Sequence, residues 1–84
     1  MNPDYDFQTS DMVEISVLLY FGFEPMTVKT DEADSRRKWF IFEQTKELEA
    51  VLNRLSQGKL LIEPVRFFGA HKILKQKLKY HAIL

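Results

Sequence analysis

Residues 36–44 have the sequence RRKWFIFEQ and decide the fold of this chain. Their centre, residues 39–42, consists of aromatic and β-branched side chains without helical spacing, which favours a β-strand. Alternate side chains of a strand point to opposite faces, so Trp39 and Ile41 lie on one side and the two phenylalanines on the other. Both faces are apolar, and each therefore needs cover from the rest of the chain or from a partner.

Shorter alternations of apolar and polar residues before this stretch predict two more strands. Residues 5–9 alternate aromatic and polar side chains and form an edge strand, and a second strand begins after Pro25 and ends at Thr30. The charged loop at residues 31–37 is too long for a two-residue turn. We expect it to connect an antiparallel hairpin between the second strand and the aromatic one.

Two stretches carry the signals of amphipathic helices. The first is residues 12–21, preceded by Asp11 at a capping position and followed by Gly22, which suits a left-handed residue after a helix. The second follows Thr45, has leucine and valine side chains at helical spacing, and stops at Gly58. Both helices are expected to pack on the aromatic strand.

A last helix is predicted from Val65 to about Ala82, because Pro64 fits a first helical turn. It is amphipathic, with an apolar and a basic stripe on opposite sides. The apolar stripe consists of Phe67, Ala70, Leu74 and Leu78. The basic stripe consists of Lys72, Lys75 and Lys79, with Arg66 and Lys77 at its flank. No acidic residue occurs from Val65 to Leu84.

These elements predict an α+β fold in which three helices pack with a small, mainly antiparallel sheet. The sheet has three strands, or four if the apolar connection around Leu61 also forms one. With 84 residues the chain has room for one compact domain. We place this domain at residues 1–84 and expect its ordered core at residues 5–82.

The composition offers little for catalysis. The chain has no cysteine, which excludes disulfides, thiolate metal sites and cysteine nucleophiles. The histidines, His71 and His81, are ten residues apart, about 15 Å along a helix, and cannot share a metal. No serine has a histidine or lysine at a known motif spacing, and no glycine-rich turn could hold a phosphate. We therefore expect a protein that is not an enzyme and needs no cofactor or metal.

The sequence also argues against membrane attachment. No stretch approaches the roughly 20 apolar residues of a membrane span, and Met1 is not followed by a basic and then an apolar leader segment. Together with the lack of cysteine, this favours a cytoplasmic protein.

Charge is segregated along the chain, although the net charge is zero. Residues 1–34 carry eight acids and one base, whereas residues 35–84 carry eleven bases and four acids. This asymmetry indicates either a polyanionic partner for the second half or two halves that neutralise each other in the fold.

Two features are candidates for nucleic-acid binding. The first is the basic triplet Arg36, Arg37 and Lys38, which directly precedes Trp39 and two phenylalanines. Cations that bind phosphate next to rings that stack on bases are typical of sheets that bind single strands; the alternative is that all three rings belong to the core. The second feature is the lysine stripe of the last helix, which is typical of a phosphate-contacting helix and also of a solvated face.

The order of these motifs resembles the DUF5659 domain family. The resemblance covers about residues 5–80 and rests on residues 7–11 (FQTSD), 20–23 (YFGF) and 38–42 (KWFIF), together with the connector at residues 58–64 and the lysine-rich last helix. It implies a phage or mobile-element context. No activity is assigned to the family, so the resemblance implies no functional residues.

The sequence leads to one hypothesis and one alternative. The hypothesis is a non-catalytic nucleic-acid-binding accessory protein that uses the basic last helix, together with residues 36–39 if the fold brings them onto the same face. The alternative is a protein-binding module, either a homodimer or an inhibitor of a host defence protein in which the acidic loop residues Asp31, Glu32 and Asp34 imitate nucleic acid. The two models use opposite charges.

Overall fold

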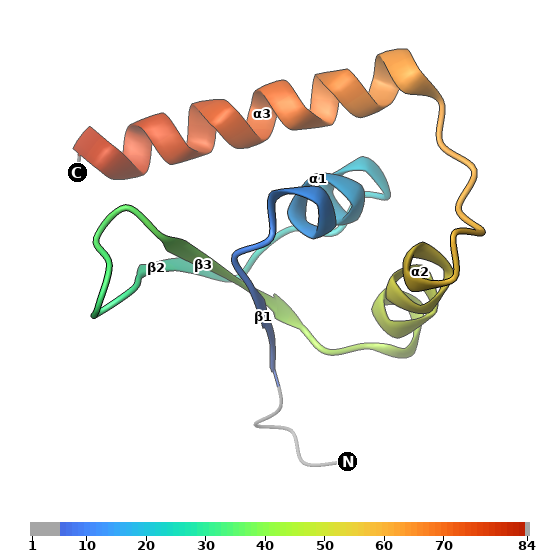
Figure 1. The fold of residues 1–84 in the computed structure, drawn as a ribbon, viewed down its shortest axis with the longest axis horizontal. Coiled ribbons are helices and arrows are strands. Elements are labelled where there is room, and N and C mark those ends of the chain that lie inside the picture. The colour runs from blue at the N-terminus through green and yellow to red at the C-terminus, as the bar shows by residue number, and fades with distance from the viewer. Residues whose placement is uncertain (1–5, 84) are drawn as a thin grey trace.

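The computed structural model describes residues 6–83, with side chains up to Lys79. Residue 5 of the predicted edge strand and the side chain of His81 therefore lie outside the described part. The elements follow one another as β1 (Asp6–Thr9), α1 (Met12–Tyr20), β2 (Thr27–Thr30), β3 (Lys38–Glu43), α2 (Lys46–Ser56) and α3 (Pro64–Ile83) (Figure 1).

The three strands form one antiparallel sheet with the order β1-β3-β2, so the aromatic strand is central. The register pairs Phe42 with Phe7 of β1 and Phe40 with Val28 of β2. Because directly paired residues share a face of the sheet, these four side chains lie together on one side. The predicted α+β fold, with three helices and an antiparallel sheet, is confirmed.

The fourth strand that we considered around Leu61 is not formed in the described residues. Two backbone hydrogen bonds form the C-terminal end of α2, from Gly58 N to Leu55 O and from Lys59 N to Arg54 O, and Gly58 has a φ of +69°. This ending turns the chain away from the helix axis. The following residues pair with neither β1 nor β2, and Leu61 is 92% exposed.

Helix starts follow the capping residues that the sequence indicated. Asp11 Oδ1 accepts hydrogen bonds from the backbone N–H of Val13 and of Glu14, and Thr45 Oγ1 accepts one from Leu48 N. Such caps satisfy N–H groups that have no partner inside the helix. Gly22 ends α1 with a φ of +91°, a conformation that strains any residue with a Cβ.

The core lies between the phenylalanine face of the sheet and the three helices. Phe40 and Phe42 are each 1% exposed and pack with Leu18 of α1, Leu48 of α2 and Leu74 of α3. Figure 1 shows α1 beneath α3, and α2 beside α1 at the end of β3. The helices therefore cover the phenylalanine face of the sheet; on the other face Ile41 is buried and Trp39 is half-buried, and neither belongs to this cluster.

The long helix α3 is held on α1 along the predicted apolar stripe. Ala70 and Leu74 are buried, and Phe67 and Leu78 are half-buried. At the start of α3, the hydroxyl of Tyr20 accepts a hydrogen bond of 2.9 Å from Glu63 N. Within the described residues, no helix is long and apolar enough to cross a membrane.

Candidate nucleic-acid interface

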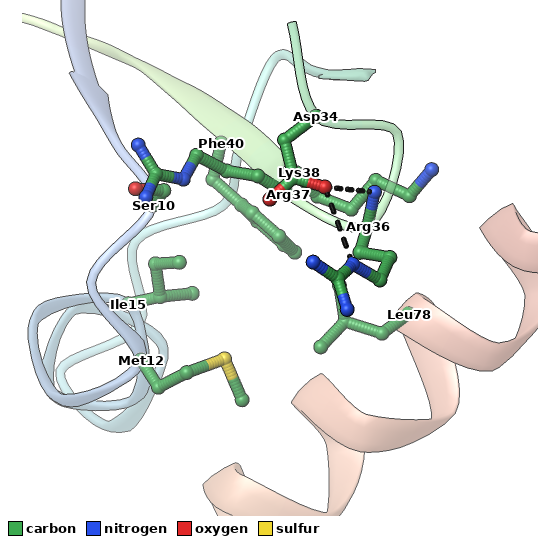
Figure 2. Close-up of a pocket in the computed structure, with 9 residues that line it drawn as sticks. All are labelled: Ser10, Met12, Ile15, Asp34, Arg36, Arg37, Lys38, Phe40 and Leu78. Carbon is green, nitrogen blue, oxygen red and sulfur yellow. Dashed lines mark hydrogen bonds and ion pairs between the residues drawn. The ribbon is translucent and has the colours of Figure 1, made fainter. Parts of the chain in front are cut away.

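A cleft of about 450 Å³ opens where the first turn of α1, the start of β3 and the C-terminal half of α3 meet (Figure 2). Its apolar lining comes from three elements that are distant in sequence: Met12 and Ile15 of α1, Phe40 of β3 and Leu78 of α3. Ile15 and Phe40 are core residues, so they form the floor, whereas Met12 is partly exposed.

The polar lining of the cleft is dominated by cations. Arg36, Arg37 and Lys38 all line it, together with Ser10 and Asp34. Figure 2 shows Arg36 on the side of α3 and Arg37 reaching toward Ser10. Three positive charges and one carboxylate thus surround an apolar floor, an arrangement that attracts an anion carrying an apolar group.

The loop between β2 and β3, residues 31–37, holds these cations in place. Arg36 Nε lies 3.4 Å from Asp34 Oδ1, and both side chains are largely open to solvent. Lys38 Nζ donates hydrogen bonds to Thr30 Oγ1 at 2.9 Å and to the carbonyl of Ser35 at 3.3 Å. The guanidinium of Arg36 is therefore positioned by one exposed carboxylate, a contact that water and salt screen strongly.

Asp31, the first residue of the same loop, accepts hydrogen bonds that fix the loop's conformation. Its carboxylate accepts a hydrogen bond of 2.7 Å from Trp39 Nε1 and further bonds from the backbone N–H of Ala33 and of Asp34. These hydrogen bonds hold the pKa of the Asp31 carboxyl below its usual value. The bond from Trp39 has the largest effect, the two backbone N–H groups follow, and the charge of Arg37 adds to it. The loop is thus fixed by hydrogen bonds to one ionised side chain.

The lysines of α3 divide between two sides of the helix. Lys72, Lys75 and Lys79 are exposed, and Lys75 and Lys79 come one turn before and directly after Leu78 of the cleft. Lys77 instead lines a separate groove of about 230 Å³ that also contains Phe23. Within the stripe, Lys75 and Lys79 are thus the lysines nearest along α3 to the residue that lines the cleft, Leu78.

Arg66 is remote from this region. It precedes Leu78 by twelve residues, about 18 Å along the helix. Its guanidinium lies over the ring of Tyr20, 5.3 Å from the centroid, where it stabilises the start of α3 by a cation–π contact.

The three rings of the aromatic strand separate onto two faces. Phe40 and Phe42 are core residues, so neither can stack on a base. Trp39 is half-buried on the other face, opposite Lys29, and lines a depression of about 360 Å³. The alternative that all three rings belong to the core therefore fits the two phenylalanines, whereas Trp39 is half-buried and lies outside the core cluster.

The acidic residues of the alternative model, Asp31, Glu32 and Asp34, all lie in the β2–β3 loop. Asp31 is bound by Trp39, and Asp34 by Arg36, so Glu32 alone of the three is exposed without a hydrogen bond inside the described part of the chain. That part contains no cluster of three or more carboxylates and histidines able to hold a metal ion.

Comparison with known families identifies the chain. The model of the family Domain of unknown function (DUF5659) matches residues 4–81. The chain belongs to the DUF5659 family. The resemblance derived from the FQTSD, YFGF and KWFIF segments is therefore confirmed. No curated protein and no solved structure is significantly similar to this DUF5659 domain.

One polar contact of the DUF5659 domain has no counterpart in the sequence motifs. Ser16 Oγ of α1 lies 3.1 Å from His71 Nδ1 of α3, across 55 positions of the chain. Ser16 is 0% exposed, so its hydroxyl cannot reach a substrate. The pair connects the two helices. Its only sequence signal is a polar residue at a buried position of α1 together with a histidine beside the apolar stripe of α3.

Proposed function

We propose that this DUF5659 domain is a cytoplasmic, non-catalytic nucleic-acid-binding accessory protein of the phage or mobile-element type. Its interface consists of the basic triplet, residues 36–38, and the lysine stripe of α3, which is Lys72, Lys75 and Lys79. The observation that carries the proposal is the cleft itself: Arg36 and Leu78, 42 positions apart in the sequence, line the same cavity. Two separate basic segments thereby adjoin one another.

The charge environment supports this interface. In the described part of the chain, Arg36 with Asp34 is the only ion pair, so the lysines of α3 are available for an external anion. No carboxylate occurs on α3 itself. Lysine and arginine side chains that contact phosphates displace counterions, which makes such binding strong at low salt and independent of sequence.

The alternative of a protein-binding module receives less support. An acidic loop that imitates nucleic acid needs free carboxylates, yet two of the three are engaged within the loop and three cations follow at once in residues 36–38. A homodimer through the outer face of α3 would bury Phe68, which is 65% exposed, but would also bring the lysine stripes of two copies together.

The test is a salt series of fluorescence anisotropy with labelled single- and double-stranded DNA and RNA. Replacing Lys72, Lys75 and Lys79 together with glutamine should reduce the slope of log affinity against log salt by about 2.7 on duplex DNA, roughly 0.9 per phosphate contact. The matched control replaces Lys29, Lys46 and Lys59, which are exposed elsewhere on the domain. Equal slopes for both triple variants would refute the interface, and absence of binding at low salt would refute the function.

A further inference from the structure

We propose that the cleft between α1, β3 and α3 binds a single unpaired base, so that the domain prefers nucleic acid with an unpaired nucleotide to continuous duplex. This inference rests on the proposed function and goes beyond it, because phosphate contacts alone do not distinguish paired from unpaired strands. It assigns to the cleft a chemical class of ligand: a planar, largely apolar ring with a phosphate attached.

The shape and chemistry of the cleft suit a base. Its volume of about 450 Å³ lies within the range of pockets that hold small organic groups. Met12 is 38% exposed and Leu78 is half-buried, so these two side chains offer the accessible aliphatic surface of the cleft, whereas Ile15 and Phe40 are each 1% exposed and only close its floor. A phosphate or a sugar alone would leave this apolar surface in contact with water, whereas the face of a base would cover it.

The charges at the cleft are placed to bind the phosphate of the same nucleotide. The side chain of Arg36 is 91% exposed and lies beside Leu78, so its guanidinium can bind a phosphate while the attached base enters the cleft. Asp34 Oδ1 is held by Arg36, so the lining offers the hydroxyl of Ser10 and the second carboxylate oxygen of Asp34, Oδ2. These are the groups that form hydrogen bonds with the polar edge of a base.

Neighbouring lysines of α3 continue the path of the nucleic-acid backbone. Lys75 and Lys79 flank Leu78 along α3. A strand whose terminal base sits in the cleft can therefore lay its next phosphates along the helix, where the lysines are exposed. A base within a duplex is paired and stacked, and it cannot present its face to the cleft without being extruded.

The test compares two DNA hairpins at the same salt concentration. One carries a single unpaired nucleotide at its end, and the other carries an abasic residue at the same position. The charges are identical, so the ratio of the two affinities reports the base alone. Wild-type protein should prefer the intact nucleotide by about fivefold, because the base removes aliphatic surface of Met12 and Leu78 from water without stacking on an aromatic ring.

Two variants locate the effect. Met12→Glu puts a carboxylate into the wall of the cleft and should lower the ratio to about one. Val13→Glu makes the same charge change at the next residue, which is exposed and does not line the cleft, and should keep the ratio. Both introduced glutamates lie in the first turn of α1, where a negative charge interacts favourably with the helix dipole.

The outcomes separate the two proposals. If the wild-type ratio is one while blunt hairpins still bind with the expected salt slope, the cleft inference is wrong and the proposed function stands. If no hairpin binds, both are wrong. A competition experiment adds one further outcome. If a polyglutamate peptide with one phenylalanine displaces the intact hairpin at the same concentration as adenosine monophosphate, the cleft binds an acidic protein segment and the inference is overturned.

Discussion

Replacement of Leu74 by alanine tests how α3 is attached to the rest of the molecule. Leu74 is 0% exposed and packs in the core with Ile15, Leu18 and the two phenylalanines of β3. Truncating a fully buried leucine removes its transfer free energy and leaves a cavity, at a cost of about 3 kcal/mol. For a chain of 84 residues the total free energy of unfolding is roughly 4 to 13 kcal/mol. The variant should therefore stay folded but lose a large part of its stability.

Urea denaturation monitored by far-UV ellipticity and by Trp39 emission measures this cost. With a slope near 1 kcal/mol per molar urea, the midpoint should fall by about 3 M. Ile73→Ala is the matched control, because Ile73 is the preceding residue of the same helix and is 50% exposed. Its truncation should cost less than about 1.5 kcal/mol. Equal midpoints for the two variants would show that α3 does not pack on α1 through Leu74, and the description of the core would be wrong.

Two further predictions concern polar contacts. Folding lowers the pKa of Asp31, so its carboxylate stabilises the protein at pH values above the ordinary 3.8 and loses this contribution as pH falls through the lower folded-state value. Trp39 emission should change with a midpoint below 3.8, and Asp31→Asn should abolish this transition whereas Glu32→Gln should retain it. Ser16→Ala should lower the free energy of unfolding measured by urea denaturation by about 1 kcal/mol, because it removes one hydrogen bond. The cost stays this small because His71 is half-buried, so water can reach its ring. A change below the error of the measurement would show that the pair does not connect the helices.

Features that depend on neighbouring residues could be predicted from the sequence. Asp11 and Thr45 cap helices, and Gly22 and Gly58 adopt positive φ, as their positions indicated. Pro64 begins α3. These signals act within one turn of the chain, where side-chain hydrogen bonds and backbone sterics dominate. The separation of the two phenylalanines from Trp39 and Ile41 follows from the two-residue period of a strand, which is also local; which of the two faces carries the core does not follow from it.

Features that depend on residues distant in the sequence could not be predicted from it. The cleft exists because Leu78 lies against the hairpin loop, and that position follows from the way α3 crosses α1, which no local pattern encodes. The bond from Trp39 to Asp31 requires the hairpin to be closed. The fourth strand considered at Leu61 was wrong for the same reason. The apolar run there has strand character, but it becomes a strand only where it can pair with a free edge of the sheet.

The central place of β3 in the sheet has a consequence for biosynthesis. Both β1 and β2 pair only with β3 in the described sheet, although they precede it in the chain. A ribosome that adds about 5 to 20 residues per second needs roughly 1 to 3 s to proceed from Thr30, the end of β2, to Glu43, the end of β3. During this interval the nascent chain carries two strands that still lack their partner. Leu74 is added later still, so the domain completes its core only after α3 has been synthesised.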